Sequence, residues 1–192
     1  RFREEDDTTP IVMMGYYNKP DKTAEVLTKD GWLRTGDVGK FVKQNGKEYL
    51  KITDRKKELL KTSGGKYVAP APIEGMLRED FMVEQAAVIG NNRKFVSALI
   101  LPAFESLENW CTDYNLSATS PAVMIQLPDV RQYYKKLVDR LNPNFSKVEQ
   151  IKKFELVAGP WTVESGHLTP TMKLKRRMID ETCKETIEHI YS

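Results

Sequence analysis

Two short polar motifs in the first third of the sequence contain a carboxylate and a guanidinium. Residues 31–37 end in Gly36-Asp37, and Arg55 lies in the motif of residues 54–57. A carboxylate on a turn loosened by glycine can accept two hydrogen bonds from a vicinal diol, and arginine offers a fork of donors to hydroxyls and phosphates. Each residue alone is more often a turn aspartate or a surface cation. Together they offer partners for a vicinal diol and for hydroxyls or phosphates beside it.

Further cations lie in a glycine-containing loop and in a basic segment near the C-terminus. The loop Ser63-Gly64-Gly65-Lys66 either is solvated or lets backbone N–H groups approach a ligand, and it lacks the spacing of a Walker phosphate loop. Residues 173–177 place lysines and arginines in the first turn of an expected helix, where cations oppose the helix dipole. This segment therefore needs a reason other than helix stability, and a polyanionic partner is one such reason.

The remaining reactive residue types and the overall charge narrow the function classes. His167 and His189 have no companions at ligand spacing, and we interpret both as non-catalytic. Cys111 and Cys183 are far apart and indicate neither a disulfide framework nor a zinc site, which suits a reducing cytosol.

The net charge of +3 is too mild to indicate nucleic acid as the main partner. The sequence starts without an initiator methionine or a signal peptide, so we expect a piece of a longer protein.

Turn residues and apolar spacing predict two β-hairpins and several helices. Residues 38–42 and 47–52 are strands joined at Asn45-Gly46, a pair that suits a type I′ turn. The other expected strands are residues 86–90, 95–101 and 154–157, and helices are expected at 21–29, from Pro70, at 104–114, 130–141 and 145–151, and from about 174. Strands and helices that mix without strict βαβ alternation predict an α+β fold with a small sheet covered by helices.

The order of these motifs resembles that of the adenylate-forming enzymes, the superfamily of acyl-CoA synthetases, luciferases and peptide-synthetase adenylation domains. The resemblance covers nearly the whole chain and is closest to the long-chain fatty acyl-CoA synthetase branch. Two segments favour that branch, residues 63–70 and residues 168–176. Shorter acyl and aryl ligases usually have glycine immediately before the catalytic lysine, whereas Met172 precedes Lys173 here.

The resemblance implies a role for each motif. Asp37 would bind the ribose hydroxyls of ATP and AMP, with Arg55 assisting at the ribose and phosphates, and Lys173 would be the catalytic lysine of adenylation. The later thioester-forming pose would bring the glycine loop against CoA, with these residues taking part: Lys61, Gly64 and Gly65. Asp54 and Lys57 would belong to a hinge, with Lys57 as the pivot.

The resemblance also implies a domain layout and a reaction. Residues 1–53 would end a large N-terminal AMP-binding domain as a β-rich remnant, residues 54–57 would be the hinge, and residues 58–192 the mobile C-terminal domain with a short mixed sheet flanked by helices. The parent enzyme would use ATP, magnesium and CoA to convert a long-chain fatty acid to acyl-AMP and then acyl-CoA. Magnesium would be held mainly by the N-terminal domain, no metal ligand is expected in this chain, and the fragment alone is expected to be inactive.

Two other interpretations stay open. The parent could hand its acyl group to a carrier protein instead of CoA. Alternatively, the chain is a basic interaction module that docks on membrane headgroups or an acidic partner through residues 173–177. A cytoplasmic location is expected in each case, with a peripheral membrane contact compatible with all of them.

Overall fold

The computed structural model describes residues 12–116 and 120–192. The chain divides into two compact units, Arg1–Lys57 and Glu58–Ser192. The division follows the last residue of the expected hinge. The expected domain boundaries themselves stay a prediction.

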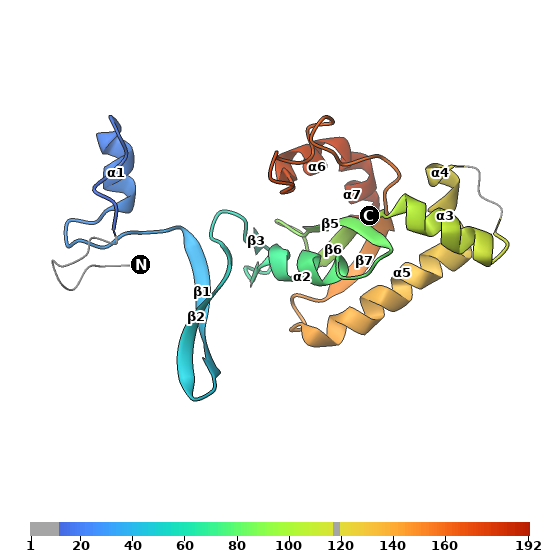
Figure 1. The fold of residues 1–192 in the computed structure, drawn as a ribbon, viewed down its shortest axis with the longest axis horizontal. Coiled ribbons are helices and arrows are strands. Elements are labelled where there is room, and N and C mark those ends of the chain that lie inside the picture. Colours follow the sequence, from blue (N-terminus) through green and yellow to red (C-terminus); the bar gives the residue numbers. More distant parts are fainter. Residues whose placement is uncertain (1–11, 117–119) are drawn as a thin grey trace. The chain divides into compact units, whose positions relative to one another are not determined.

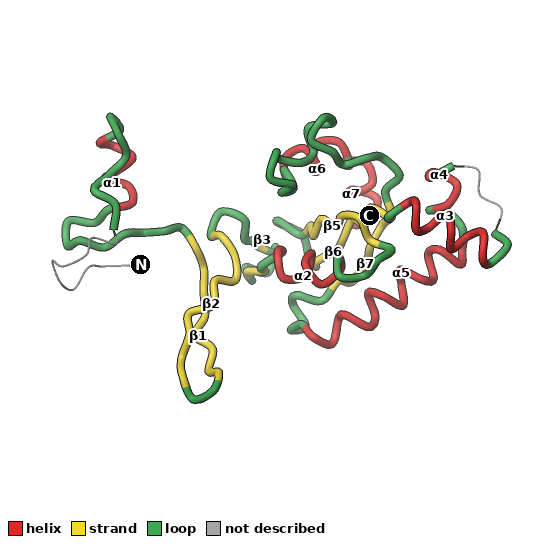
Figure 2. The backbone as a smooth tube through the Cα atoms, viewed as in Figure 1, coloured by secondary structure: helices red, strands yellow, loops and turns green. Residues whose placement is uncertain are grey.

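The first unit is built around one β-hairpin (Figure 2). β1 (Asp37–Gln44) pairs antiparallel with β2 (Lys47–Arg55), and the connecting Asn45 and Gly46 have φ of 52° and 74°. Both values lie in the left-handed region that a type I′ turn requires, so the predicted hairpin is confirmed. The short helix α1 (Pro20–Val26) starts at a proline, as the fixed φ of proline favours, and none of its residues is buried.

The second unit contains a three-stranded mixed sheet between two layers of helices (Figure 1). β5 (Val83–Ile89) pairs antiparallel with β6 (Val96–Pro102), and β6 pairs parallel with β7 (Ile151–Leu156). A second, two-stranded sheet joins β3 (Leu60–Lys61) to β4 (Tyr67–Val68). The predicted α+β class, with a short mixed sheet flanked by helices, is therefore confirmed.

Alternation along the strands explains why both faces of the larger sheet are covered. Val88 and Ala98 belong to one apolar core and Ile89 and Leu99 to another, because successive side chains of a strand point to opposite faces. The first core is closed by α2 (Pro70–Leu77), α3 (Phe104–Asp113), α4 (Pro121–Met124) and α5 (Pro128–Leu141). The second is closed by Trp161, α6 (Arg176–Thr182) and α7 (Lys184–Tyr191).

Two predicted helices differ in the structure. Residues 145–151 were expected to be helical, but only the 3₁₀ turn η1 (Asn142–Asn144) precedes β7. The Asn142 amide explains the difference, because it accepts from the Ile151 N–H (2.9 Å) and donates to the Ile151 carbonyl (3.0 Å), as a neighbouring strand would. The expected single helix from residue 174 is two helices that meet at Cys183, where the Thr182 hydroxyl donates to the Met178 carbonyl at 2.7 Å.

Candidate functional site

The carboxylate and guanidinium singled out from the sequence form a cross-strand pair. Asp37 and Arg55 are register partners at the open end of the β1–β2 hairpin, and Arg55 Nε lies 3.6 Å from Asp37 Oδ1. Gly36 has a φ of 78°, and its carbonyl accepts from the Lys56 N–H at 2.8 Å. The pair therefore lies within the first unit, and strand β2 extends into residues 54–57, where a hinge was expected.

The arrangement of this pair leaves both groups accessible to a ligand. The side chains of Asp37 and Arg55 are 30% and 71% exposed. A separation of 3.6 Å is an ion pair and not a hydrogen bond, so the lone pairs of the carboxylate can still accept from hydroxyl groups. The geometry is chemically suited to a diol beside an anion.

The glycine loop forms the tight turn between β3 and β4. The Thr62 N–H donates to the Lys66 carbonyl at 2.9 Å, and the Thr62 hydroxyl accepts from the Lys66 N–H at 3.2 Å. Gly65 has a φ of 75°, and a Cβ placed on Gly64 or Gly65 would meet no atom within 4 Å. The backbone of these two glycines therefore faces open space, where a ligand could approach it closely.

Lys173 lies at the tip of a small hairpin. Leu168 and Leu174 form an antiparallel bridge at its base, and the Lys175 N–H donates to the His167 carbonyl at 2.8 Å. Met172 has a φ of 59° and its N–H donates to the Thr169 carbonyl. Lys173 is exposed, and no carboxylate of the described residues pairs with it. The hairpin therefore presents the ammonium group of Lys173 to solvent without a carboxylate that neutralises it.

One stem of this hairpin is held by His167, which the sequence had suggested only as a non-catalytic residue. Its Nδ1 lies 2.8 Å from the Ser165 hydroxyl and its Nε2 3.0 Å from the Thr182 hydroxyl. Its ring stacks on the buried Trp161 with 6.4 Å between ring centroids. Because Thr182 follows His167 by 15 residues and belongs to α6, spacing along the sequence gave no signal of this contact.

The other stem is held by Arg176. Its Nη2 donates to the buried Glu74 carboxylate at 2.9 Å, and its Nη1 donates to the Val88 carbonyl at 3.2 Å. Arg177 pairs with Glu181 one helical turn later. Two of the four cations in residues 173–177 therefore already have anionic partners, which supplies a structural reason for cations at the start of α6.

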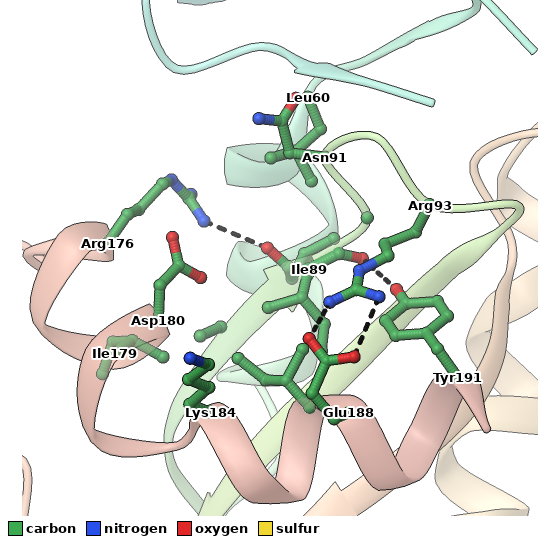
Figure 3. A pocket seen from close by; sticks show the side chains of 14 residues that line it. Leu60, Ile89, Asn91, Arg93, Arg176, Ile179, Asp180, Lys184, Glu188 and Tyr191 are labelled. Carbon is green, nitrogen blue, oxygen red and sulfur yellow. Dashed lines mark hydrogen bonds and ion pairs between the residues drawn. The ribbon is translucent and has the colours of Figure 1, made fainter. Parts of the chain in front are cut away.

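A cavity of about 210 Å³ opens between β5, α6 and α7 (Figure 3). Its floor is apolar, with Ile89, Ile179 and Ile187, and the Arg93–Glu188 ion pair lies at its rim. Burial raises the pKa of Asp180, which also lines the cavity, although Arg176 opposes the shift. The charges around the cavity are mixed in sign, so it does not select a single class of charged ligand.

Comparison with known proteins shows the family to which the chain belongs. A family model described as the C-terminal domain of AMP-binding enzymes matches residues 57–192, well over half of the chain. The chain belongs to this family. The AMP-binding C-terminal domain thus includes the glycine loop and the Lys173 hairpin, whereas Asp37 and Arg55 precede the matched residues.

Curated relatives extend over nearly the whole chain. A long-chain-fatty-acid–CoA ligase of Mycobacterium tuberculosis is 38% identical over 95% of this chain and 30% of its own length. Human long-chain-fatty-acid–CoA ligase 6 is 35% identical over 95% of this chain and 26% of its own length. The chain therefore spans about a third or less of the curated relatives that it matches.

Solved structures show the same fold. The adenylation domain of a carboxylate reductase from Mycobacterium chelonae covers 93% of this chain with a TM-score of 0.69 and 31% identity, and the match spans 26% of that structure. The adenylation domain of a Segniliparus rugosus carboxylic acid reductase, solved with AMP and a carboxylic acid, has a TM-score of 0.67 and 26% identity over 93% of this chain and 26% of its own. The AMP-binding C-terminal domain thus shares its architecture with adenylation domains.

Two features are absent from the described residues. In residues 12–116 and 120–192, no group of three His, Cys, Asp or Glu side chains could hold a metal ion. No helix in that part of the chain is long and apolar enough to cross a membrane.

Proposed function

We propose that this chain serves in an ATP-dependent long-chain fatty acid–CoA ligase, where residues 1–53 end a large N-terminal AMP-binding domain and residues 58–192 form the mobile C-terminal domain. Asp37 and Arg55 bind the ribose and phosphates of ATP and AMP, and Lys173 acts in adenylation. The observation that carries the proposal is the exposed, unpaired Lys173 at the tip of a hairpin whose two stems are both anchored. The resemblance to ligases of long-chain fatty acids supports the choice of substrate.

The charge on Lys173 addresses the main obstacle of the first half-reaction. A fatty carboxylate must attack a phosphate, and the two anions repel each other. A cation held about 4 Å from each anion attracts it by about 4 kcal/mol at an effective dielectric constant near 20. Because the hairpin is anchored before the substrates arrive, little reorganisation is needed when charge develops.

The second half-reaction would use the glycine loop. We propose that residues 54–57, with Asp54 and Lys57, act as a hinge after acyl-AMP has formed. Lys173 would withdraw, and the loop with Lys61, Gly64 and Gly65 would line the path of the CoA thiol. Separation of two steps by a conformational change in one cleft is a known form of domain gating. The open space above Gly64 and Gly65 supports the assignment.

The remaining parts of the reaction would come from the N-terminal domain. Magnesium would accompany ATP there. We therefore assign no residue of this chain a role in binding magnesium. The 192-residue chain alone is expected to be inactive, and turnover by a pure preparation of it would contradict the proposal.

The test uses the full-length ligase and compares Lys173→Ala with Lys175→Ala, a neighbouring exposed lysine. We expect Lys173→Ala to slow acyl-AMP formation by about 10²–10³-fold, as the loss of a preorganised charge-stabilising group does. Conversion of supplied acyl-AMP to acyl-CoA should largely survive. Lys175→Ala should slow neither step. Equal losses in both half-reactions for Lys173→Ala would contradict the assigned role.

A carrier protein is the second candidate acceptor, because solved structures with this fold include adenylation domains of carboxylic acid reductases, one of them solved with an attached carrier domain. ATP–pyrophosphate exchange followed by thioester analysis with CoA, or with a phosphopantetheine carrier, separates the two acceptors. A vesicle-binding assay tests peripheral membrane contact through residues 173–177. The pairing of Arg176 and Arg177 with carboxylates leaves fewer cations for that contact.

A further inference from the structure

The turn between β5 and β6 holds the start of the glycine loop through three hydrogen bonds. The Asn91 side-chain oxygen accepts from the Lys61 N–H at 3.2 Å, and the Asn92 N–H donates to the Lys61 carbonyl at 2.7 Å. The Ser63 N–H donates to the Arg93 carbonyl at 2.9 Å. Three backbone groups of the loop thus have their partner in the turn: the Lys61 N–H, the Lys61 carbonyl and the Ser63 N–H. The position of the turn therefore fixes the position of residues 61–63.

The same turn is held from its other side by α7. Both guanidinium nitrogens of Arg93 donate to the Glu188 carboxylate, with Nη1 at 3.2 Å from Oε2, and the Arg93 guanidinium lies 4.9 Å from the centre of the Tyr191 ring (Figure 3). The Tyr191 hydroxyl lies 3.2 Å from the carbonyl of Ile89 and 3.1 Å from that of Phe95, which share its one hydrogen and flank the turn.

Helix α7 is itself tied to the sheet. Lys153 of β7 donates to the Ile190 carbonyl at 2.7 Å and also lies 5.8 Å from the centre of the Phe95 ring. Ile187 and Ile190 are buried in the second core. The contacts therefore run without interruption from the sheet through α7 and the turn to the glycine loop.

We propose that Asn91 and Arg93 are positioning residues for thioester formation, which set the glycine loop against the CoA thiol, and that Glu188 and Tyr191 of α7 fix them there. This inference rests on the proposed function of the loop. A bidentate arginine–carboxylate pair suits this task, because it fixes the orientation of the guanidinium as well as its distance. The Gly65 N–H donates to the Thr62 carbonyl at 2.9 Å, so the position of the two glycines follows that of residues 61–63, which the turn holds.

The first experiment replaces Asn91 in the full-length ligase. Asn91→Ala removes the acceptor for the Lys61 N–H, whereas Asn91→Asp keeps an oxygen at that position. We expect Asn91→Ala to slow formation of acyl-CoA from supplied acyl-AMP by roughly tenfold, since small displacements of positioning groups have effects of that order or larger. Acyl-AMP formation should change little, and Asn91→Asp should restore most of the thioester rate.

The second experiment exchanges the charges of the ion pair and does not depend on the folding of Asn91→Ala. Arg93→Glu and Glu188→Arg should each raise hydrogen exchange in residues 58–68 and slow the thioester step, whereas the double variant should recover both. The matched control is Arg131→Ala, which breaks another arginine–glutamate pair, that with Glu155. It should leave the loop and both half-reactions unchanged.

The outcomes separate this inference from the proposed function. Equal loss of both half-reactions in Asn91→Ala, or no recovery in the charge-exchanged double variant, would overturn the positioning role. If the wild-type ligase makes no acyl-AMP from long-chain fatty acids, the proposed function fails. Unchanged hydrogen exchange of residues 58–68 in Arg93→Glu would then overturn the inference on its own.

Discussion

Arg176 donates to the buried carboxylate of Glu74 at 2.9 Å, although 102 residues separate the two. Glu74 is 6% exposed, and its second oxygen accepts from the Val88 N–H at 2.8 Å. One carboxylate thus joins α2, strand β5 and the segment that follows Lys173. The Val88 N–H supplies a hydrogen bond, whereas Arg176 supplies the positive charge that offsets the buried carboxylate of Glu74.

Loss of Arg176 should therefore destabilise the chain. Arg176→Ala leaves a buried carboxylate without its cation, a change that costs about 3 kcal/mol of unfolding free energy. Urea unfolding of the 192-residue chain measures the loss as a lower midpoint with an unchanged m-value. Arg177→Ala is the control, because its Glu181 partner is exposed and the variant should unfold as the wild type does. Equal midpoints for the two variants would contradict this reading of Glu74.

Met172 should reverse the usual order of glycine and alanine. With its φ of 59°, any residue with a Cβ is strained there by about 1–2 kcal/mol, whereas glycine is not. At ordinary positions glycine is less stable than alanine by about 0.5–1 kcal/mol. We expect Met172→Gly to be more stable than Met172→Ala in parallel thermal unfolding experiments. The opposite order would show that the hairpin tip relaxes to another conformation.

His167 should matter to the first half-reaction without touching substrate. His167→Ala removes both hydroxyl contacts and the stack on Trp161, so the stem that carries Lys173 loosens. We expect a roughly tenfold slower acyl-AMP formation with a much smaller effect on the thioester step. Faster hydrogen exchange of the Lys175 amide should accompany it. His189→Ala, which changes an exposed histidine of α7, should alter neither rate.

The stabilisation that the Arg93–Glu188 ion pair contributes should depend on pH only under acidic conditions. Hydrogen bonds from Arg93 hold the pKa of Glu188 below its ordinary value, so the native state favours the ionised carboxylate more than the unfolded chain does. The stabilisation is therefore complete above the unfolded value of about 4.3 and is lost as the pH falls through the lower native value.

An NMR titration of the Glu188 carboxyl carbon checks this. Arg93→Ala should move its pKa upward to about the ordinary value. Arg131→Ala should leave it where it is. A pKa of Glu188 that does not respond to Arg93→Ala would show that the ion pair is not formed in solution.

The elements that sequence patterns predicted correctly are those specified by nearby residues. The Asn45-Gly46 turn, the proline at the start of α2 and the continuous apolar runs within β5 and β6 act within a few residues, so local chemistry was enough. The helix expected at 145–151 failed because Asn142 holds the backbone of Ile151, a side-chain contact that hydrophobic spacing cannot report.

The sequence predicted which residues belong to the candidate site, but not how other residues hold them in space. Motif order pointed to Lys173 and to the glycine loop, but the contacts that hold these two segments come from residues far away in sequence. Glu74 reaches Arg176 and Arg93 reaches Glu188 over about a hundred residues, and those pairings exist only once the sheet and helices have packed. No spacing rule connects such partners, because the fold alone brings them together.

The register of a single hairpin fixes Asp37 opposite Arg55, so their 3.6 Å separation is a property of the first unit alone. A rotation about Lys57, the expected pivot of the hinge, does not alter it. In a ligase with two successive steps, the nucleotide would then stay bound in the same way from ATP to AMP. Only the groups that act on the acyl carbon would change, with the glycine loop replacing Lys173. The acyl-AMP intermediate would then remain bound through its nucleotide between the two steps.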